Sequence, residues 1–133
     1  MEIFRVLIID DEEAFVATLV KRLRRRNLAC EGVFTGSAGL DWLREHDCDV
    51  VLLDMRLPDM DGNEVLRRIK EDKPEQQVVI LTGHASVSAG LEGIRAGAHD
   101  YLMKPVEFET LFEKLAAAHE EGRRMALPLA AGG

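Results

Sequence analysis

Short apolar segments typical of buried strands alternate along the chain with segments that have the apolar periodicity of amphipathic helices. The strand-like segments lie at 4–9, 29–34, 50–53, 78–81 and 101–103, and the segment at 29–34 is the most polar. The helical patterns lie at 12–26, 37–45, 62–72, 86–95 and 107–123. Strict alternation is typical of a parallel sheet whose right-handed crossovers place helices on both faces. The sequence therefore predicts an α/β fold, a doubly wound five-stranded parallel sheet.

The length and composition indicate one folded domain without a membrane segment. The chain has 133 residues, of which 47% are hydrophobic and 31% are charged, as is typical of soluble globular proteins. No apolar stretch approaches the roughly 18 residues that span a bilayer. The N-terminal residues MEIFRVLIIDDEE lack the basic lead and cleavage site of a signal peptide. We expect a cytoplasmic protein with no membrane partner, a domain at residues 3–124 and a flexible tail or linker stub at 125–133.

Charge and cysteine usage exclude several classes of partner and site. The net charge of −7 argues against direct nucleic-acid binding by this chain. The basic run KRLRRR at 21–26 is expected on the solvated side and at the C-terminal end of its helix, where the helix dipole favours cations. Asn27 suits a left-handed cap after that helix. Cys30 and Cys48 show neither zinc nor disulfide spacing, so we expect free thiols.

Charged and polar residues follow the strand-like runs at the points where those runs end. Asp10 and Asp11 follow the first run, Asp54 follows VVLL, Thr82 follows VVIL, and Lys104 follows YLM. Equivalent ends of parallel strands meet at one edge of a sheet, where α/β proteins bind ligands. The sequence therefore predicts that three carboxylates, a hydroxyl and an ammonium group converge there.

This combination of groups suits phosphoryl transfer. Three crowded carboxylates repel one another unless a cation intervenes, and an all-oxygen site favours Mg²⁺, with Mn²⁺ as a substitute. Asp54 can act as a carboxylate nucleophile toward a phosphoryl group. Lys104 and Thr82 can contact two of the phosphoryl oxygens. Taken singly, the acids and Thr82 could be helix caps and Lys104 a surface lysine, so the prediction depends on the combination.

Four segments resemble the successive signature segments of response-regulator receiver domains: VLIIDDEE, VVLLDMRLPDMDG, VVILTGHAS and AGAHDYLMKP. The resemblance covers residues 3–118 and implies the flavodoxin-like strand order 2-1-3-4-5. It implies that a sensor histidine kinase or a histidine phosphotransfer protein phosphorylates Asp54. The implied Mg²⁺ ligands are Asp10, Asp11, Asp54 and the backbone carbonyl of Arg56. A cis Lys104–Pro105 bond is also implied, and the chain would catalyse only its own phosphorylation and dephosphorylation.

The resemblance further implies a switch. Thr82 would move toward the phosphoryl group and Tyr101 would turn inward, changing the surface of the fourth helix, fifth strand and fifth helix that controls an output domain or protein. Homodimerisation on phosphorylation stays open. Gly90 and Gly93 lie inside the fourth helical pattern, where each costs about 1 kcal/mol relative to Ala. They indicate either a helix that shifts easily or close packing against a neighbour. Without the resemblance, Tyr101 would be a core aromatic whose hydroxyl reaches water.

Arg56 and His84 lie two residues beyond Asp54 and Thr82, so their side chains are expected to flank the site. We hypothesise that they tune the lifetime of the phosphoryl group. An exposed loop histidine is an equally good interpretation of His84.

Three rival interpretations share parts of this pattern. A Rossmann-type nucleotide binder needs glycines after the first strand, where this chain has DDEEA. A haloacid-dehalogenase-like phosphatase resembles the site but has a second acid two residues after its nucleophile, where this chain has Arg56. The remaining alternative is a receiver-like interaction scaffold that works without phosphorylation, although such proteins usually lack a site residue and none is missing here.

Overall fold

The computed structural model describes residues 3–83 and 87–126, in which strands and helices alternate as predicted. The strands are β1 (Arg5–Ile9), β2 (Ala29–Val33), β3 (Val50–Asp54), β4 (Gln77–Thr82) and β5 (Asp100–Met103). The helices are α1 (Glu13–Arg25), α2 (Gly36–Glu45), α3 (Gly62–Asp72), α4 (Val87–Arg95) and α5 (Phe108–Ala126). None of these described helices is long and apolar enough to cross a membrane.

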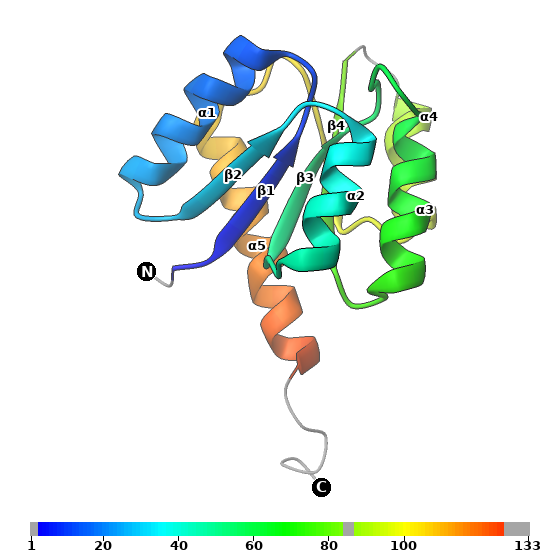
Figure 1. Cartoon of the computed structure of the whole chain (residues 1–133). Helices are drawn as coiled ribbons and strands as arrows, with labels where there is room; N and C mark the ends of the chain where they lie inside the picture. The colour runs from blue at the N-terminus through cyan, green and yellow to red at the C-terminus, as the bar shows by residue number, and fades with distance from the viewer. Residues whose placement is uncertain (1–2, 84–86, 127–133) are drawn as a thin grey trace, which may run out of the picture.

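The five strands form one parallel sheet in the order β2-β1-β3-β4-β5, which confirms the predicted fold and strand order. Figure 1 labels the first four strands, β1 to β4. The central strand β3 is buried along its whole length, as its continuous apolar run predicts, whereas the edge strand β2 is partly exposed. In the register, Ile9 pairs with Leu53, Asp54 with Leu81, and Thr82 with Met103. The carboxyl ends of β1, β3, β4 and β5 therefore lie along the same edge.

Helices cover both faces of the sheet. On one face α1 and α5 pack over a core that includes Leu23, Leu52 and Leu115, and on the other α2 and α3 pack over a core that includes Leu53 and Leu66 (Figure 1). Each of these leucines is fully buried, and burial of one such side chain contributes about 2 kcal/mol. The apolar stripe predicted for α5 is buried at Phe108, Leu111, Phe112 and Leu115. Successive residues of each central strand therefore point to opposite faces of the sheet and pack in opposite cores.

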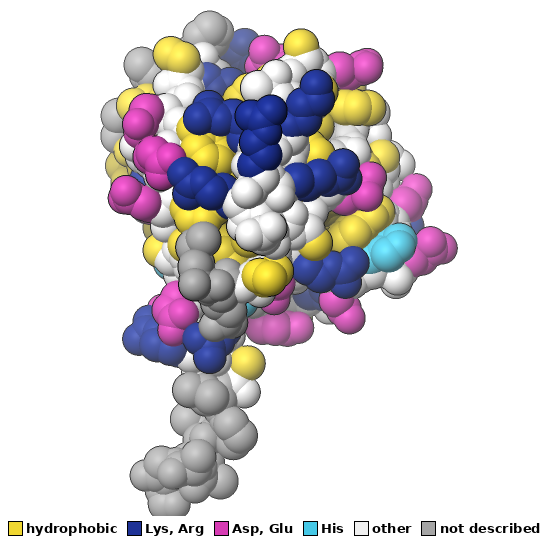
Figure 2. Space-filling model, turned by 90° about the vertical axis from the view of Figure 1, so that its left-hand side faces the viewer, with side chains coloured by type: hydrophobic (Ala, Val, Ile, Leu, Met, Phe, Trp, Pro, Cys, Tyr) yellow, Lys and Arg dark blue, Asp and Glu magenta, His cyan; other side chains and the backbone are white. Residues whose placement is uncertain are grey.

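The basic run at the end of α1 is solvent-facing, and Figure 2 shows Lys and Arg side chains gathered on this side of the molecule. The structure adds contacts that the sequence did not predict. The guanidinium of Arg22 lies 4.1 Å from the centre of the Phe108 ring, and that of Arg26 lies 4.6 Å from the centre of the Phe112 ring. Arg26 also forms an ion pair with Glu109. These cations therefore join α1 to α5. Asn27 adopts a φ of 67° after the helix, which confirms the predicted left-handed cap.

The two glycines of α4 are positions of close packing. A Cβ on Gly90 would lie 2.5 Å from Cδ2 of Tyr101, and a Cβ on Gly93 would lie 2.0 Å from Cδ1 of Ile80. Both distances are far shorter than ordinary carbon contacts. The absence of side chains therefore lets α4 approach β4 and β5, which supports the packing interpretation of these glycines.

The predicted thiols are free in the structure. Burial raises the pKa of both Cys30 and Cys48 to about 12. They therefore stay protonated at neutral pH and are poor nucleophiles.

Candidate functional site

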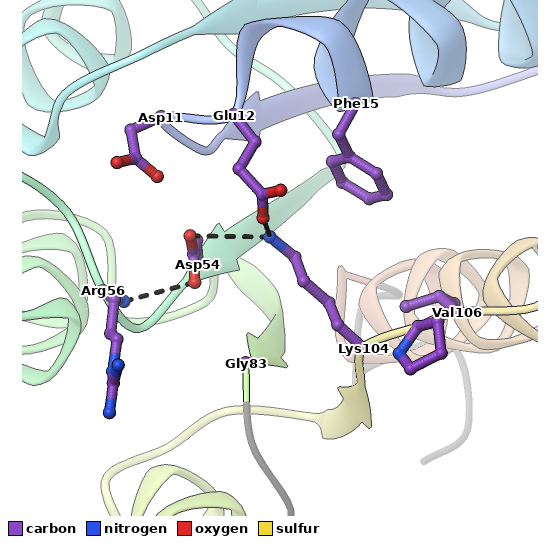
Figure 3. A pocket seen from close by; sticks show the side chains of 9 residues that line it. Asp11, Glu12, Phe15, Asp54, Arg56, Gly83, Lys104 and Val106 are labelled. Atoms are coloured by element: carbon purple, nitrogen blue, oxygen red, sulfur yellow. Dashed lines mark hydrogen bonds and ion pairs between the residues drawn. The ribbon is translucent and has the colours of Figure 1, made fainter.

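A pocket of about 680 Å³ opens at the carboxyl edge of the sheet (Figure 3). It is lined by Asp11, Glu12, Phe15, Asp54, Arg56, Gly83, Lys104, Pro105 and Val106. These residues lie at the end of β3, in the segments that follow β1, β3, β4 and β5, and in the first turn of α1, because parallel pairing places those strand ends together. The pocket therefore lies at the edge of the sheet where the strand-end pattern places the polar residues.

Three carboxylates meet at this pocket: Asp11 and Asp54 line it, and Asp10 is buried beside them. Asp10 is fully buried, Asp54 is 3% exposed and Asp11 is exposed. One oxygen from each lies within 4.8 Å of the others. The backbone fixes two of them: Oδ1 of Asp10 accepts from the Glu12 amide at 2.9 Å, and Oδ1 of Asp54 accepts from the Arg56 amide at 3.2 Å. The convergence expected from distant parts of the sequence is therefore present.

The Lys104 ammonium reaches into the carboxylate cluster from the end of β5. Its Nζ lies 2.8 Å from Oδ2 of Asp10 and 3.7 Å from Oδ2 of Asp54, and it forms an ion pair with Glu12. It also lies 4.8 Å from the centre of the Phe15 ring. Burial opposes the charged form, but the carboxylates of Asp10 and Glu12 raise the pKa of Lys104 above its ordinary value. The lysine is therefore cationic over the whole physiological range.

Burial raises the pKa of the Asp54 carboxyl to about 6, and the negative charge of Asp10 acts in the same direction. The Arg56 amide and the Lys104 ammonium oppose this rise but do not cancel it. The ionised form of Asp54 is thus held in an unfavourable environment. A further cation, or a group that removes the negative charge from its oxygen, would relieve this cost.

The donor set fits a hard divalent cation. Oδ2 of Asp10 is buried and, apart from its ion pair with Lys104, has no hydrogen-bond partner among the described residues. The exposed carboxylate of Asp11 and the buried one of Asp54 complete an all-oxygen cluster, the chemistry that Mg²⁺ prefers. Asp10, Asp11 and Asp54 therefore form an acidic site whose chemistry suits a hard divalent cation. The role of the Arg56 carbonyl stays a prediction.

The remaining predicted residues lie around this cluster. Thr82 is buried at the end of β4, and its hydroxyl donates to the Leu102 carbonyl at 3.4 Å. Tyr101 is half-buried on β5 beneath Gly90 of α4. The exposed Arg56 lines the pocket, whereas His84 lies outside the described residues. The Lys104–Pro105 bond is cis, as expected.

A carboxylate that the sequence reasoning missed fixes the loop after β3. The two oxygens of Asp59 accept from the backbone amides of Gly36 and Ser37, each at 2.9 Å, at the start of α2. These amides hold the pKa of Asp59 below its ordinary value. The loop that carries Arg56 is thereby attached to a neighbouring helix. The segment LPDMDG marks a turn, but nothing local indicates which helix Asp59 would cap.

Known proteins match this chain in sequence and in structure. The response regulator receiver domain family matches residues 6–116. The transcriptional regulatory protein CutR of Streptomyces coelicolor is 38% identical over 125 residues, which are 94% of this chain and 56% of CutR. The CheY-like receiver domain protein of Methanospirillum hungatei superposes with a TM-score of 0.88 at 30% identity, covering 94% of this chain and all (100%) of that one. The BeF3-activated DrrB receiver domain superposes with a TM-score of 0.80 at 31% identity, covering 90% and 99%. The chain spans about half the length of the curated relatives it matches.

Proposed function

The chain belongs to the response-regulator receiver domain family, and from that premise we propose that it is a phosphorylation-activated signalling switch that accepts a phosphoryl group on Asp54. The observation that carries the proposal is the meeting of Asp54 with two further carboxylates and the Lys104 ammonium, at a pocket that Asp11, Asp54 and Lys104 line. The acidic pocket is consistent with such a switch. A similar receiver domain described as BeF3-activated gives further support.

The proposed reaction is an in-line displacement at phosphorus. A carboxylate oxygen of Asp54 forms a new bond to phosphorus while the bond between phosphorus and the donor breaks, and the electron pair of that bond leaves with the donor. The product is an acyl phosphate on Asp54. Lys104 neutralises one phosphoryl oxygen and Thr82 donates a hydrogen bond to another. Because Thr82 donates to Leu102 in this structure, its hydroxyl must turn to make that contact.

Asp10, Asp11, Asp54 and the backbone carbonyl of Arg56 would hold the divalent cation. When bound, Mg²⁺ or Mn²⁺ would neutralise the charge of the carboxylates and of the phosphoryl group. Within the protein, the Glu12 and Arg56 amides orient the oxygens of Asp10 and Asp54. Lys104 places a permanent positive charge beside both acids.

We propose that the switch is read at the surface of α4, β5 and α5. Movement of Thr82 toward the phosphoryl group would let Tyr101 turn inward from its place beneath Gly90, and α4 would then shift. Leu91 and Ile94 of α4 and Met103 of β5 are exposed apolar side chains on this surface, and they suit contact with an output partner.

The proposed partners are a sensor histidine kinase or a histidine phosphotransfer protein as donor, and an output domain or protein as receiver of the signal. The matched region is only about half of each curated relative, which is compatible with an output domain in those proteins. We propose a phosphorylatable unit at residues 3–124, acting in the cytoplasm without direct contact to nucleic acid and with homodimerisation as one form of output. Arg56 and His84 would tune phosphoryl lifetime, and an unchanged dephosphorylation rate after replacing both with Ala would contradict that role.

The alternative is an interaction scaffold that works without phosphorylation, and one experiment separates the two. The protein is incubated with acetyl phosphate and Mg²⁺, and its intact mass is compared with that of Asp54→Asn and of Asp47→Asn. Asp47 is a matched control because its side chain is 99% exposed and lies outside the pocket. We expect one added phosphoryl group in the parent and in Asp47→Asn and none in Asp54→Asn. An unmodified parent would favour the scaffold.

A further inference from the structure

Glu12 extends its side chain across the pocket instead of capping its own helix. A residue at the start of a helix usually accepts a hydrogen bond from the backbone of the first turn, but the side chain of Glu12 accepts none. Its carboxylate forms an ion pair with Lys104, which is 92 residues further along the chain (Figure 3). Glu12 therefore connects the start of α1 to the end of β5.

The Lys104 ammonium is shared unequally among three carboxylates. It has three N–H donors, and it contacts Asp10 at 2.8 Å and Glu12 in a direct ion pair. The distance of 3.7 Å to Asp54 is too long for a hydrogen bond. The proposed phosphoacceptor is thus the carboxylate that the lysine holds least closely. The centre of the Phe15 ring lies 4.8 Å from the ammonium, within the range of a cation–π contact.

Resting on the proposed phosphotransfer function, we propose that Glu12 is a positioning residue that holds Lys104 away from Asp54 in the unphosphorylated protein and so slows phosphoryl uptake. The transfer is the one described above. A bond forms between an oxygen of Asp54 and phosphorus, the bond between the donor and phosphorus breaks, and its electron pair leaves with the donor. During this step Lys104 exchanges the Glu12 carboxylate for a phosphoryl oxygen, and no proton moves between them. Glu12, whose side chain is already 60% exposed, is released to solvent.

The test compares Glu12→Gln with Glu13→Gln. Both variants remove one negative charge from adjacent exposed positions, but no ion pair in the described part of the chain joins Glu13 to Lys104. The initial rate of phosphoryl incorporation from acetyl phosphate is followed by intact mass at saturating Mg²⁺, and thermal unfolding verifies that each variant is folded. Since exposed ion pairs are weak, we expect Glu12→Gln to react about two- to five-fold faster than the parent. Glu13→Gln should stay close to the parent rate.

Ionic strength supplies a readout that a purely structural role would not change. Salt screens an exposed pair, so the rate difference between parent and Glu12→Gln should narrow as salt rises from about 0.05 M to about 0.5 M. The proposal would be overturned if both variants reacted faster by the same factor, or if Glu12→Gln reacted more slowly than the parent. It would also be overturned if the rate difference did not change with salt concentration. These outcomes differ from failure of the proposed function. If the proposed function were wrong, the parent protein itself would gain no mass.

Discussion

Replacing Asp54 with Asn should stabilise the protein at neutral pH when divalent cations are absent. The side chain of Asp54 is only 5% exposed, and the Lys104 ammonium lies 3.7 Å from its Oδ2. This burial raises its pKa from an ordinary 3.8 to about 6. At about 1.4 kcal/mol for each pH unit, the rise corresponds to about 3 kcal/mol against the ionised form. We therefore expect Asp54→Asn to gain about 1–3 kcal/mol in the free energy of unfolding.

The gain should depend on pH in one direction. The pKa of Asp54 is higher in the folded than in the unfolded protein, so the protonated carboxyl stabilises the fold fully below about pH 4. That contribution is lost as the pH rises through about 6. Asparagine does not titrate, and the difference between variant and parent should therefore grow from about pH 4 to about pH 7.

Urea unfolding in a chelator at pH 5 and at pH 8 measures this difference directly. Asp47→Asn is the control, because its exposed carboxylate pairs only with Lys73 at 3.4 Å among the described residues and should change stability by less than about 0.5 kcal/mol. If Asp54→Asn were no more stable than the parent at pH 8, burial would not destabilise the ionised form of Asp54. This result would refute the prediction.

Three further predictions concern the metal, the fourth helix and the loop after β3. Mg²⁺ in large excess over its Kd should raise the free energy of unfolding by about 1–3 kcal/mol, and Asp11→Asn should lose most of this gain in thermal scans with and without the ion. Gly90→Ala should destabilise by about 1–3 kcal/mol in urea unfolding, because its Cβ would lie 2.5 Å from the Tyr101 ring. Asp59→Ala should lose about 1 kcal/mol in the same assay, since two amides of α2 lose their acceptor.

Each of these three predictions has a control variant and a result that would contradict it. For the metal, an Asp11→Asn variant that kept the full Mg²⁺ gain would place the ion elsewhere. Gly83→Ala is matched to Gly90→Ala because a Cβ on Gly83 meets nothing within 4 Å, and equal stabilities of the two variants would argue against close packing. Asp72→Ala is the control for Asp59→Ala, and equal losses in both would contradict the role of the two amides.

The strand-end pattern was sufficient to predict the fold and the centre of the site. In a parallel sheet, the residues that directly follow the strands all lie along the same edge, whatever the details of packing. That rule placed Asp10, Asp54 and Lys104 together although they come from distant parts of the sequence. It works because it depends on topology, which the alternation of apolar runs already determines.

What the pattern missed are contacts set by the direction of a flexible side chain. Glu12 could have capped its own helix, and only the position of Lys104 decides that it does not. Asp59 could have capped the nearby start of α3, but Asp61 occupies that position and Asp59 reaches α2. For Gly90 the sequence left two interpretations, because the choice depends on Tyr101, a neighbour on another element.

The central claim is that Asp54 is the residue to which the phosphoryl group becomes attached. The most direct measurement is peptide-level mass spectrometry of the parent after incubation with acetyl phosphate and Mg²⁺, with fragmentation to locate the added group. The account predicts one phosphoryl group on the peptide that contains Asp54, located on that carboxylate and missing when Mg²⁺ is chelated. A phosphoryl group found on any other residue of the unmodified sequence, or none at all, would contradict it.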